Sequence, residues 1–424
     1  MTKAFLYVLM GALVLGLAAC AQPVASEVIQ SEKQRGTSPD VSETDVTTLV
    51  NGNSACAFDL YQALREEDGN LFYSPYSISL ALVMTYAGAR GDTAQQMADT
   101  LHFTLLPERL HPAFNSLDLE LGQRGQGAQG KDAQGFRLNI VNAIWGQKDY
   151  QFLDSFLDLL AENYGAGLRI LDFINAPEES RITINNWVSD QTEGRIEDLI
   201  PQGLIDALTR LVLTNAIYFN AAWQHPFSED VTKDAPFYLL NEGEVSVPMM
   251  SQTELFGYTE GEVYQAVELP YDGGELSMVV LLPRAGQFGV FEDSLDAQRV
   301  EGIIEELEYK QVALTIPKFE FESSFSLKKI LSTLGMPVAF SGGADFSCMT
   351  GNRDLFIADV IHKAFVSVDE AGTEAAAATA VVMPMAMPPE EPVKVTIDRP
   401  FVFMIRDIQT NAILFVGRIV DPST

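Results

Sequence analysis

The segment from Val366 to Met387 reads VSVDEAGTEAAAATAVVMPMAM, and the interpretation of the whole chain depends on it. Its run of four consecutive alanines, Ala375 to Ala378, favours a helix, whereas the β-branched residues between Thr379 and Val382 favour an extended chain. In an extended chain, alternate residues from Thr373 to Met383 share one face, and all of them are small or apolar. The segment can therefore be read as a helix or linker, or as a strand of a buried sheet.

The flanking sequence favours the strand. No charge and no proline occur between Ala375 and Met383, but four prolines follow at Pro384, Pro388, Pro389 and Pro392. Proline cannot continue a helix, and it holds the residue before it in an extended conformation. A segment that can form a strand is thus joined to an extended, proline-rich tip. We expect an exposed loop that is also able to enter a sheet.

Composition indicates a large, folded and strongly acidic protein. The chain has 424 residues, 47% hydrophobic and 20% charged, which is enough for one large domain or two ordinary ones. It contains 27 Lys and Arg against 58 Asp and Glu, giving a formal net charge of -31. Such a surface repels polyanions, which argues against nucleic acid as a partner and against binding to an anionic membrane face.

The N-terminus has the pattern of an export signal. Lys3 precedes an apolar run from Ala4 to Ala19, which is shorter than the ~20 residues needed to span a bilayer. The run ends in Leu-Ala-Ala-Cys at Cys20, which resembles the bacterial lipobox with its lipidated cysteine. We expect residues 1–19 to be a lipoprotein signal peptide and the protein to be anchored to a bacterial membrane, in the cell envelope or outside the cell. A plain signal peptide with an incidental cysteine is the alternative.

Residues 20–50 are interpreted as the lipidated cysteine and a flexible tether. The chain from Ala21 to Val50 is rich in polar residues and has no aromatic residue, so it is expected to bury too little surface to fold. A coil of this length spans ~30 Å on average. One folded domain is expected from residue 51 to 424, with Ser54 capping its first helix. The other two cysteines, Cys56 and Cys348, either pair or remain free thiols.

Several segments carry a family resemblance, in the same order along the chain. They are NLFYSPYSIS from Asn70 to Ser79, NIVNAIW from Asn139 to Trp145, QTEG from Gln191 to Gly194, NAIYF from Asn215 to Phe219, PKF from Pro317 to Phe319, and DEAGTEAA from Asp369 to Ala376. They resemble the serpins, the protease inhibitors that trap their targets. The resemblance covers about Ser54 to Pro422 and leaves no further domain. It implies a single α+β serpin domain, in which helices surround three β-sheets and a reactive-centre loop is exposed. Strands interrupted by helices between Phe237 and Ile316 also favour an α+β fold.

The resemblance assigns roles to individual residues. The hinge of the loop consists of Glu370, Gly372, Thr373, Glu374, Ala375, Ala376, Ala377 and Ala378. The shutter, where the strands of the main sheet part, consists of Ser74, Ser77, Asn215 and His362, and Trp223 belongs to the breach. A buried asparagine such as Asn215 needs hydrogen-bond partners, which the two serines and the histidine can supply. Read alone, Ser74 and Ser77 are also typical of an ordinary helix entry.

The position of the scissile bond follows from counting along the loop as the family does. The count from Glu370 places the bond between Ala386 and Met387, and the bond between Met385 and Ala386 is the alternative. Either bond offers a small or medium apolar residue, and the loop tip has no Lys or Arg. The targets implied are therefore serine proteases of the elastase, chymotrypsin or subtilisin type, held in a covalent complex. A cysteine protease is a second class of target.

The sequence gives no support for an enzyme. Four histidines occur, His102, His111, His225 and His362, without an HExxH helix, a paired CxxC, a GxSxG elbow or a glycine-rich phosphate loop. A catalytic set of Ser74 or Ser77 with His362 is another interpretation, but a hydrogen-bonded core histidine accounts for the pattern better. We expect no catalytic residues, no metal and no cofactor.

The mechanism implied is suicide-type inhibition. In these inhibitors the protease attacks the loop and forms an acyl-enzyme, and the cleaved loop then inserts into the main sheet as a new strand. The attacking serine belongs to the target. The hinge residues Thr373 and Ala375 to Ala378 are small and uncharged, which suits insertion, since burying an unpaired charge costs several kcal/mol. A non-inhibitory serpin that acts as a binding or chaperone protein is the alternative.

The protein is expected to be a monomer that touches the membrane only through the lipid on Cys20.

Overall fold

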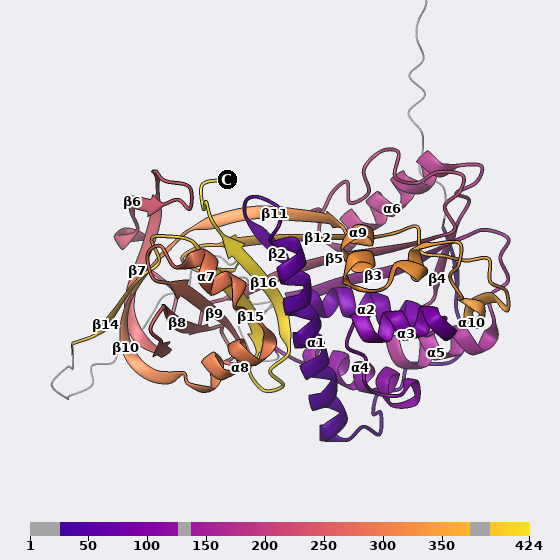
Figure 1. Cartoon of the computed structure of the whole chain (residues 1–424), viewed down its shortest axis with the longest axis horizontal. Coiled ribbons are helices and arrows are strands. Elements are labelled where there is room, and N and C mark those ends of the chain that lie inside the picture. The colour runs from indigo at the N-terminus through magenta and orange to yellow at the C-terminus, as the bar shows by residue number, and fades with distance from the viewer. Residues whose placement is uncertain (1–25, 126–136, 374–390) are drawn as a thin grey trace, which may run out of the picture.

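The computed structural model describes residues 26–125, 137–373 and 391–424, and β-sheets form the framework of this part (Figure 1). The seven-stranded sheet consists of β1 (Glu27–Ile29), β4 (Leu168–Leu171), β3 (Arg137–Gln147), β5 (Leu211–Ala222), β13 (Gly372–Thr373), β12 (Asp359–Val368) and β11 (Phe319–Ser326), in this order. The nine-stranded sheet consists of β14 (Val393–Thr396), β10 (Glu308–Pro317), β7 (Glu244–Glu260), β8 (Tyr264–Pro270), β9 (Leu276–Pro283), β15 (Phe401–Asp407), β16 (Ile413–Ile419) and β2 (Leu71–Tyr73), with β6 (Lys233–Tyr238) paired to β7.

Hydrogen bonds join the described strands into two sheets, where three were expected. The reason is the length of β7, which has 17 residues. Its first part pairs with β6, its middle with β10 and its end with β8. One continuous strand thus connects what would otherwise be two sheets. The α+β class is confirmed.

Helices surround these sheets. They are α1 (Glu43–Leu64), α2 (Pro75–Tyr86), α3 (Gly91–Thr100), α4 (Pro107–Leu121), α5 (Asp154–Tyr164), α6 (Pro177–Gln191), α7 (Phe288–Asp293), α8 (Ala297–Glu305), α9 (Lys328–Leu334) and α10 (Ser347–Thr350), with 3-10 turns at Glu229–Val231 and Pro337–Phe340. Helix α6 packs Ile184 and Val188 on one face of the seven-stranded sheet, and α2 lies against β3 and β5. Every residue of β5 is buried, as its continuous apolar run predicts for a strand covered on both faces.

Residues 26–50 belong to the folded body, so the prediction of a flexible tether is wrong for this part. Strand β1 extends the seven-stranded sheet by pairing with Leu168–Ile170 of β4. After it, Lys33 forms ion pairs with Asp158 (3.2 Å) and Glu162 (2.7 Å) on α5. The segment is held by backbone pairing and ionic contacts, which a polar composition does not exclude.

Helix α1 begins at Glu43, not near Ser54. The Ser42 side chain caps it by accepting a hydrogen bond from the backbone N–H of Asp45 (3.2 Å). Leu49 and Val50 in the first turns are buried, so the folded domain starts well before residue 51.

Both described cysteines are free thiols, and burial raises the pKa of Cys56 to about 12.

Within the described ranges, no helix is long and apolar enough to cross a membrane. The same ranges contain no group of three or more His, Cys, Asp or Glu placed to hold a metal ion.

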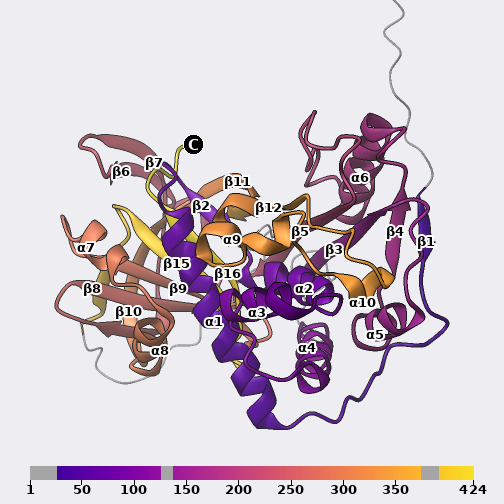
Figure 2. The same ribbon diagram turned by 45° about the vertical axis from the view of Figure 1, so that its right-hand side comes forward.

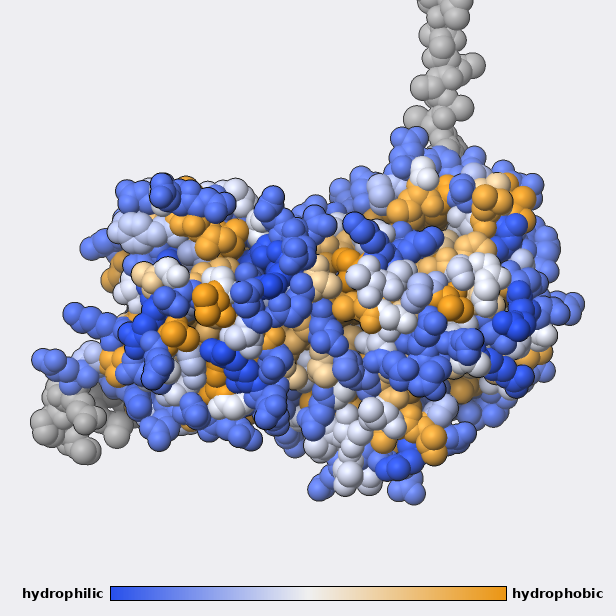
Figure 3. Space-filling view, in the orientation of Figure 1, coloured by the Kyte–Doolittle hydropathy of each residue, from blue (hydrophilic) through white to orange (hydrophobic). Residues whose placement is uncertain are grey.

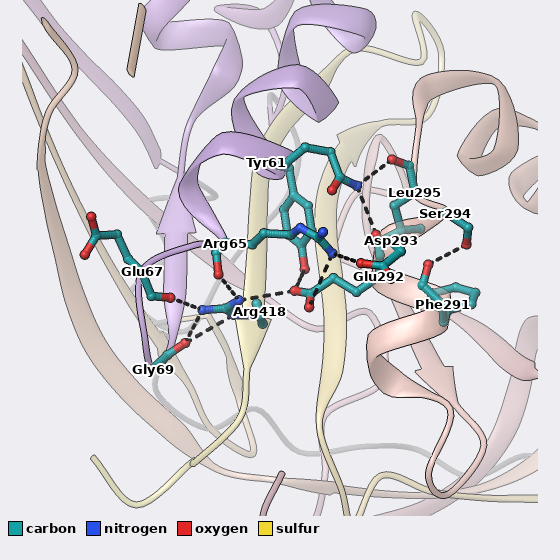
Figure 4. A network of polar contacts seen from close by, with 11 residues as sticks. Tyr61, Arg65, Glu67, Gly69, Phe291, Glu292, Asp293, Ser294, Leu295 and Arg418 are labelled. Atoms are coloured by element: carbon teal, nitrogen blue, oxygen red, sulfur yellow. Dashed lines mark hydrogen bonds and ion pairs between the residues drawn. The ribbon is translucent and has the colours of Figure 1, made fainter. Parts of the chain in front are cut away.

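A buried ionic network fixes the end of α1 to α7 and β16 (Figure 4). The Arg418 guanidinium donates to Glu292 (3.2 Å) and to the backbone carbonyls of Arg65, Glu67 and Gly69. Tyr61 donates its hydroxyl to the same Glu292 carboxylate at 2.8 Å. The side chains of Arg418 and Glu292 are only 7% and 10% exposed. This network holds β16 in place. Leu414 of the same strand accepts a hydrogen bond from Ser74, a residue of the candidate site described below.

Replacing Glu292 by Ala should therefore destabilise the fold. The substitution leaves the Arg418 charge buried without its carboxylate, which should lower the free energy of unfolding by about 3 kcal/mol, measured as a shift of the urea unfolding midpoint. Asp293→Ala is the matched control, because Asp293 is 66% exposed and pairs with Arg65 at the surface. The control should cost less than about 1 kcal/mol. Equal shifts for the two variants would contradict the assigned role of the network.

Candidate functional site

The short strand β13 lies between the ends of β5 and β12 in the middle of the seven-stranded sheet. Gly372 and Thr373 pair antiparallel with Ala222 and Ala221 of β5, and Thr373 also pairs with Val368 of β12. Earlier along both strands, Val212–Tyr218 of β5 and Asp359–Phe365 of β12 pair directly with each other, in parallel. Two of the predicted hinge residues thus already occupy a strand position where the two central strands begin to separate.

The position of Gly372 accepts no side chain. A Cβ atom there would lie 2.1 Å from the carbonyl oxygen of Ala221, which is backbone and cannot give way. The next residue, Thr373, is 1% exposed, and its Oγ1 lies 2.8 Å from the Tyr271 hydroxyl. Thr373 therefore faces into the protein, as the two-residue period of the segment predicted. The position is closed to solvent, so a charged side chain there would lose its hydration.

Trp223 holds the turn that precedes the hinge. Its ring stacks on Tyr271 with centroids 4.6 Å apart, and its Nε1–H donates to the carbonyl of Asp369 (3.0 Å). Its backbone N–H donates to the carbonyl of Ala371 (2.8 Å). The Asp369 carboxylate in turn accepts from the N–H groups of Ala371 and Gly372. Trp223, assigned to the breach from the sequence, thus lies directly against the start of the hinge.

Glu370 is anchored from two neighbouring elements. Its carboxylate accepts from Lys318 Nζ (2.7 Å) and from the Thr232 hydroxyl (2.8 Å). Burial raises the pKa of Glu370, but these hydrogen bonds lower it, and the net result is a pKa below the usual value. Glu370 therefore remains ionised at neutral pH and fixes the turn between β12 and β13, where the hinge begins.

The four predicted shutter residues meet at the seam between β5 and β12. Asn215 of β5 and His362 of β12 are register partners, and the His362 ring is hydrogen-bonded to the Asn215 side chain. Asn215 Nδ2 donates to Ser77 Oγ (2.7 Å), and Ser77 lies in the first turn of α2, which packs against the sheet. The Ser74 hydroxyl caps α2 and donates to the carbonyl of Leu414 on β16 (2.6 Å). The partners expected for Asn215 are present.

The hydrogen bonds of His362 define its tautomer. The Ser74 backbone N–H donates to Nε2 (3.2 Å), so Nε2 carries the lone pair and Nδ1–H donates to Asn215. Burial lowers the pKa of His362 to about 3. Protonation would turn Nε2 into a second donor facing the donor of Ser74. Because an unfolded histidine titrates near 6.5, stability is lost as the pH falls from about 6.5 towards 3.

This cluster is not a catalytic site. His362, Ser74 and Ser77 are completely buried, and the Ser74 hydroxyl is already bonded to a backbone carbonyl. No substrate reaches them without opening the sheet. The geometry instead ties two parallel strands to each other and to the helix beneath.

Other predicted site residues lie outside the described ranges. They are the hinge residues Glu374, Ala375, Ala376, Ala377 and Ala378, the two candidate bonds at Met385, Ala386 and Met387, and the lipidation site Cys20.

Sequence reasoning missed three contributors to the site. Asn142 of β3 accepts from Asn215 Nδ2 (2.5 Å) and donates to the carbonyl of Ser77 (3.1 Å). Lys318 and Tyr271 hold Glu370 and Thr373 respectively. The available signal was a polar residue between the apolar Val141 and Ala143 in a strand, which marks Asn142 as a residue needing buried partners. No feature of the neighbouring sequence indicates that Lys318 contacts Glu370 or that Tyr271 contacts Thr373.

Comparison with known proteins agrees with this geometry. The leukocyte elastase inhibitor A of Mus musculus is 41% identical over 392 residues, covering 88% of this chain and 99% of its own. An uncharacterized serpin-like protein of Thermococcus kodakarensis is also 41% identical, over 376 residues, covering 88% of this chain and 86% of its own. Uncleaved ovalbumin matches with a TM-score of 0.78 at 26% identity, over 88% of this chain and all of its own. The thermophilic serpin tengpin in its native state matches with a TM-score of 0.82 at 27% identity, over 94% of this chain and all of its own.

The family itself is identified by its sequence model. The model described as serpin (serine protease inhibitor) matches residues 51–422, which contain every described element of the site. With a strand-like hinge, a bonded seam and this match, the chain belongs to the serpin family of serine protease inhibitors.

Proposed function

We propose that this serpin is a suicide-type inhibitor of extracellular serine proteases, and that it is not itself an enzyme. The target cleaves the loop between Ala386 and Met387, or between Met385 and Ala386, and is held as an acyl-enzyme when the cleaved loop inserts between β5 and β12. The observation that carries the proposal is β13, because the first two residues of the insertion path are already paired in the sheet.

The register of β13 defines the path of insertion. Each residue further along the loop would pair with the residue one position earlier in β5. Continued in this way from the pair of Thr373 with Ala221, Met383 would lie opposite Leu211, the first residue of β5. Insertion would therefore run the whole length of the strand. The new strand would be antiparallel to both neighbours, replacing a parallel pairing, which is slightly weaker per residue.

The seam sets the barrier to this process. Seven register pairs between β5 and β12 and the bond between His362 and Asn215 must separate before a strand enters. Each hydrogen bond contributes only ~1 kcal/mol net, so the seam is closed but can be opened by a competing strand. The inward-facing hinge residues after Thr373 are small alanines and would enter without burying charge, while Glu374 would lie on the other face of the new strand.

The targets proposed are proteases of the elastase, chymotrypsin or subtilisin type, since the residues at both candidate bonds are apolar. The names of the mammalian relatives, leukocyte elastase inhibitors, support an elastase-like target. A cysteine protease, which also forms an acyl-enzyme, is a second class. Pulling the acylated serine along the sheet would displace it from the donors that stabilise the oxyanion and so stall deacylation.

We also propose that the mature protein is a lipid-anchored monomer. Cys20 would carry the lipid after removal of residues 1–19 and hold the inhibitor on a bacterial membrane, with its body outside the cytoplasm. The basis is the apolar leader that ends at this cysteine.

The function is tested by incubating the protein with an elastase-like protease. We expect a complex of the two proteins that survives boiling in denaturant, together with a released C-terminal peptide beginning at Met387 or Ala386. Cleavage without any stable complex, across elastase-, chymotrypsin- and subtilisin-like proteases, would favour a non-inhibitory binding or chaperone role.

Thr373→Arg should convert the inhibitor into a substrate. The arginine cannot be buried beside Tyr271, so the hinge cannot seat and insertion slows while cleavage continues. The fraction of protease trapped should fall at least ~100-fold, which corresponds to ~3 kcal/mol in the competition between the two outcomes. The matched control is Glu374→Arg, on the other face of an extended hinge, which should keep most of the trapping. Full trapping by Thr373→Arg would contradict the insertion path.

Cys20→Ser should release the protein from membranes. After expression in a bacterial host with lipoprotein processing, the parent chain should sediment with membranes and the variant should remain in the soluble fraction. Protease trapping should be the same for both, because the site lies in the folded body. Membrane association of the variant equal to that of the parent would rule out this anchor.

A further inference from the structure

The N-terminal strand and the described start of the hinge lie at opposite ends of the seven-stranded sheet. Glu27 of β1 pairs with Ile170, Ile170 with Gly146, and Gly146 with Leu211, the first residue of β5. The hinge, in contrast, pairs with the last residues of β5. Strand β14, which follows the loop, lies at the left of the molecule in Figure 1, whereas β4 and its neighbour β1 lie at the right in Figure 2. The end that holds β1 is called the tether end below.

The chain between the proposed lipid and β1 is short. Because β1 starts at Glu27, only residues 20–26 remain as a linker, and they reach at most ~24 Å when fully extended. A globular body of about 400 residues has a radius of gyration of about 21 Å and is therefore about 55 Å across. A linker shorter than the body cannot let the loop end reach the membrane. The linker therefore keeps the tether end within ~24 Å of the bilayer and excludes orientations in which the loop end touches it.

The tether end exposes large apolar side chains. Val28 on β1 is 45% exposed, Ile174 after β4 is 43% exposed, and Leu208 before β5 is 73% exposed. Two hydrogen bonds place the last two around the end of β3. The N–H of Ile174 donates to the Gln147 side chain (3.2 Å), and the N–H of Gln147 donates to the carbonyl of Arg210 (2.9 Å).

The conformation of the Leu208 turn keeps this residue outside the core. The Asp206 carboxylate accepts from the Leu208 N–H (2.8 Å), and the Asp206 N–H donates to the Thr209 hydroxyl (3.1 Å). The turn thus fixes a leucine at its tip. Apolar surface is visible at this end of the molecule, close to where the described chain begins (Figure 3).

We infer that Val28, Ile174 and Leu208 form a surface that rests on the lipid bilayer and orients the anchored inhibitor with its loop pointing away from the membrane. The inference rests on the proposed lipid at Cys20. Exposed apolar side chains beside a lipid anchor gain free energy by entering the region between headgroups and acyl chains. The exposed acidic residues Glu27, Asp149 and Asp206 outnumber the basic Lys148 and Arg210 around these strand ends, which favours uncharged headgroups over anionic ones.

The test uses the full lipidated chain on phosphatidylcholine vesicles that contain a nitroxide-labelled lipid. A fluorophore is attached at Leu208→Cys in one variant and at Tyr309→Cys in the other, with Cys348→Ser in both. Tyr309 is the matched control, because it is 74% exposed and lies on β10, the strand paired with β14. We expect quenching at position 208 to exceed quenching at position 309 at least ~5-fold. Equal quenching of vesicle-bound protein would overturn the inference.

Two further measurements distinguish a failure of this surface from a failure of the lipid anchor. If the parent chain does not co-float with vesicles, the lipid anchor itself fails, and the surface fails with it. If the chain co-floats, adding ~30% phosphatidylglycerol should reduce quenching at position 208 without releasing the protein, because carboxylates at this end repel the anionic headgroups. An increase in quenching on the anionic vesicles would contradict the assignment of uncharged headgroups.

Discussion

The parallel pairing of β5 with β12 is the constraint on which the rest of the structure depends. Two strands buried on both faces are joined by direct backbone pairing and by the bond between His362 and Asn215. The same two side chains are bonded to Ser74 and Ser77, so the seam is also fixed to α2 and, through Leu414, to β16. Opening the sheet therefore disturbs a network that reaches into the nine-stranded sheet.

The hinge occupies the one place where this seam is already open. Its entry is stabilised by ordinary contacts: a glycine packed against backbone, a threonine bonded to a buried tyrosine, and a glutamate held by Lys318 and Thr232. These contacts hold the first two strand residues while the bonded seam below excludes the others. In this state the direct pairing of β5 with β12 keeps the sheet closed. The proposed inhibition requires that the cleaved loop replace this pairing.

Features of the fold and of the site that depend on the local sequence alone could be predicted. The continuous apolar run of β5 indicated a strand covered on both faces, and a buried Asn215 required partners. The alternation along the hinge placed Thr373 on the inner face. Prediction failed where the constraint is supplied by distant residues. The polar segment before α1 gave no sign that β4 and α5 would hold it, and the long β7 joined sheets that were expected to be separate.

The central claim is that the cleaved loop becomes a new strand between β5 and β12. It is tested most directly by measuring the distance between the two edges of the sheet, with spin labels at Glu27→Cys on β1 and Ser324→Cys on β11, before and after cleavage. Insertion of one strand predicts that the distance between the labels increases by about 5 Å. An unchanged distance in the cleaved protein would contradict the account.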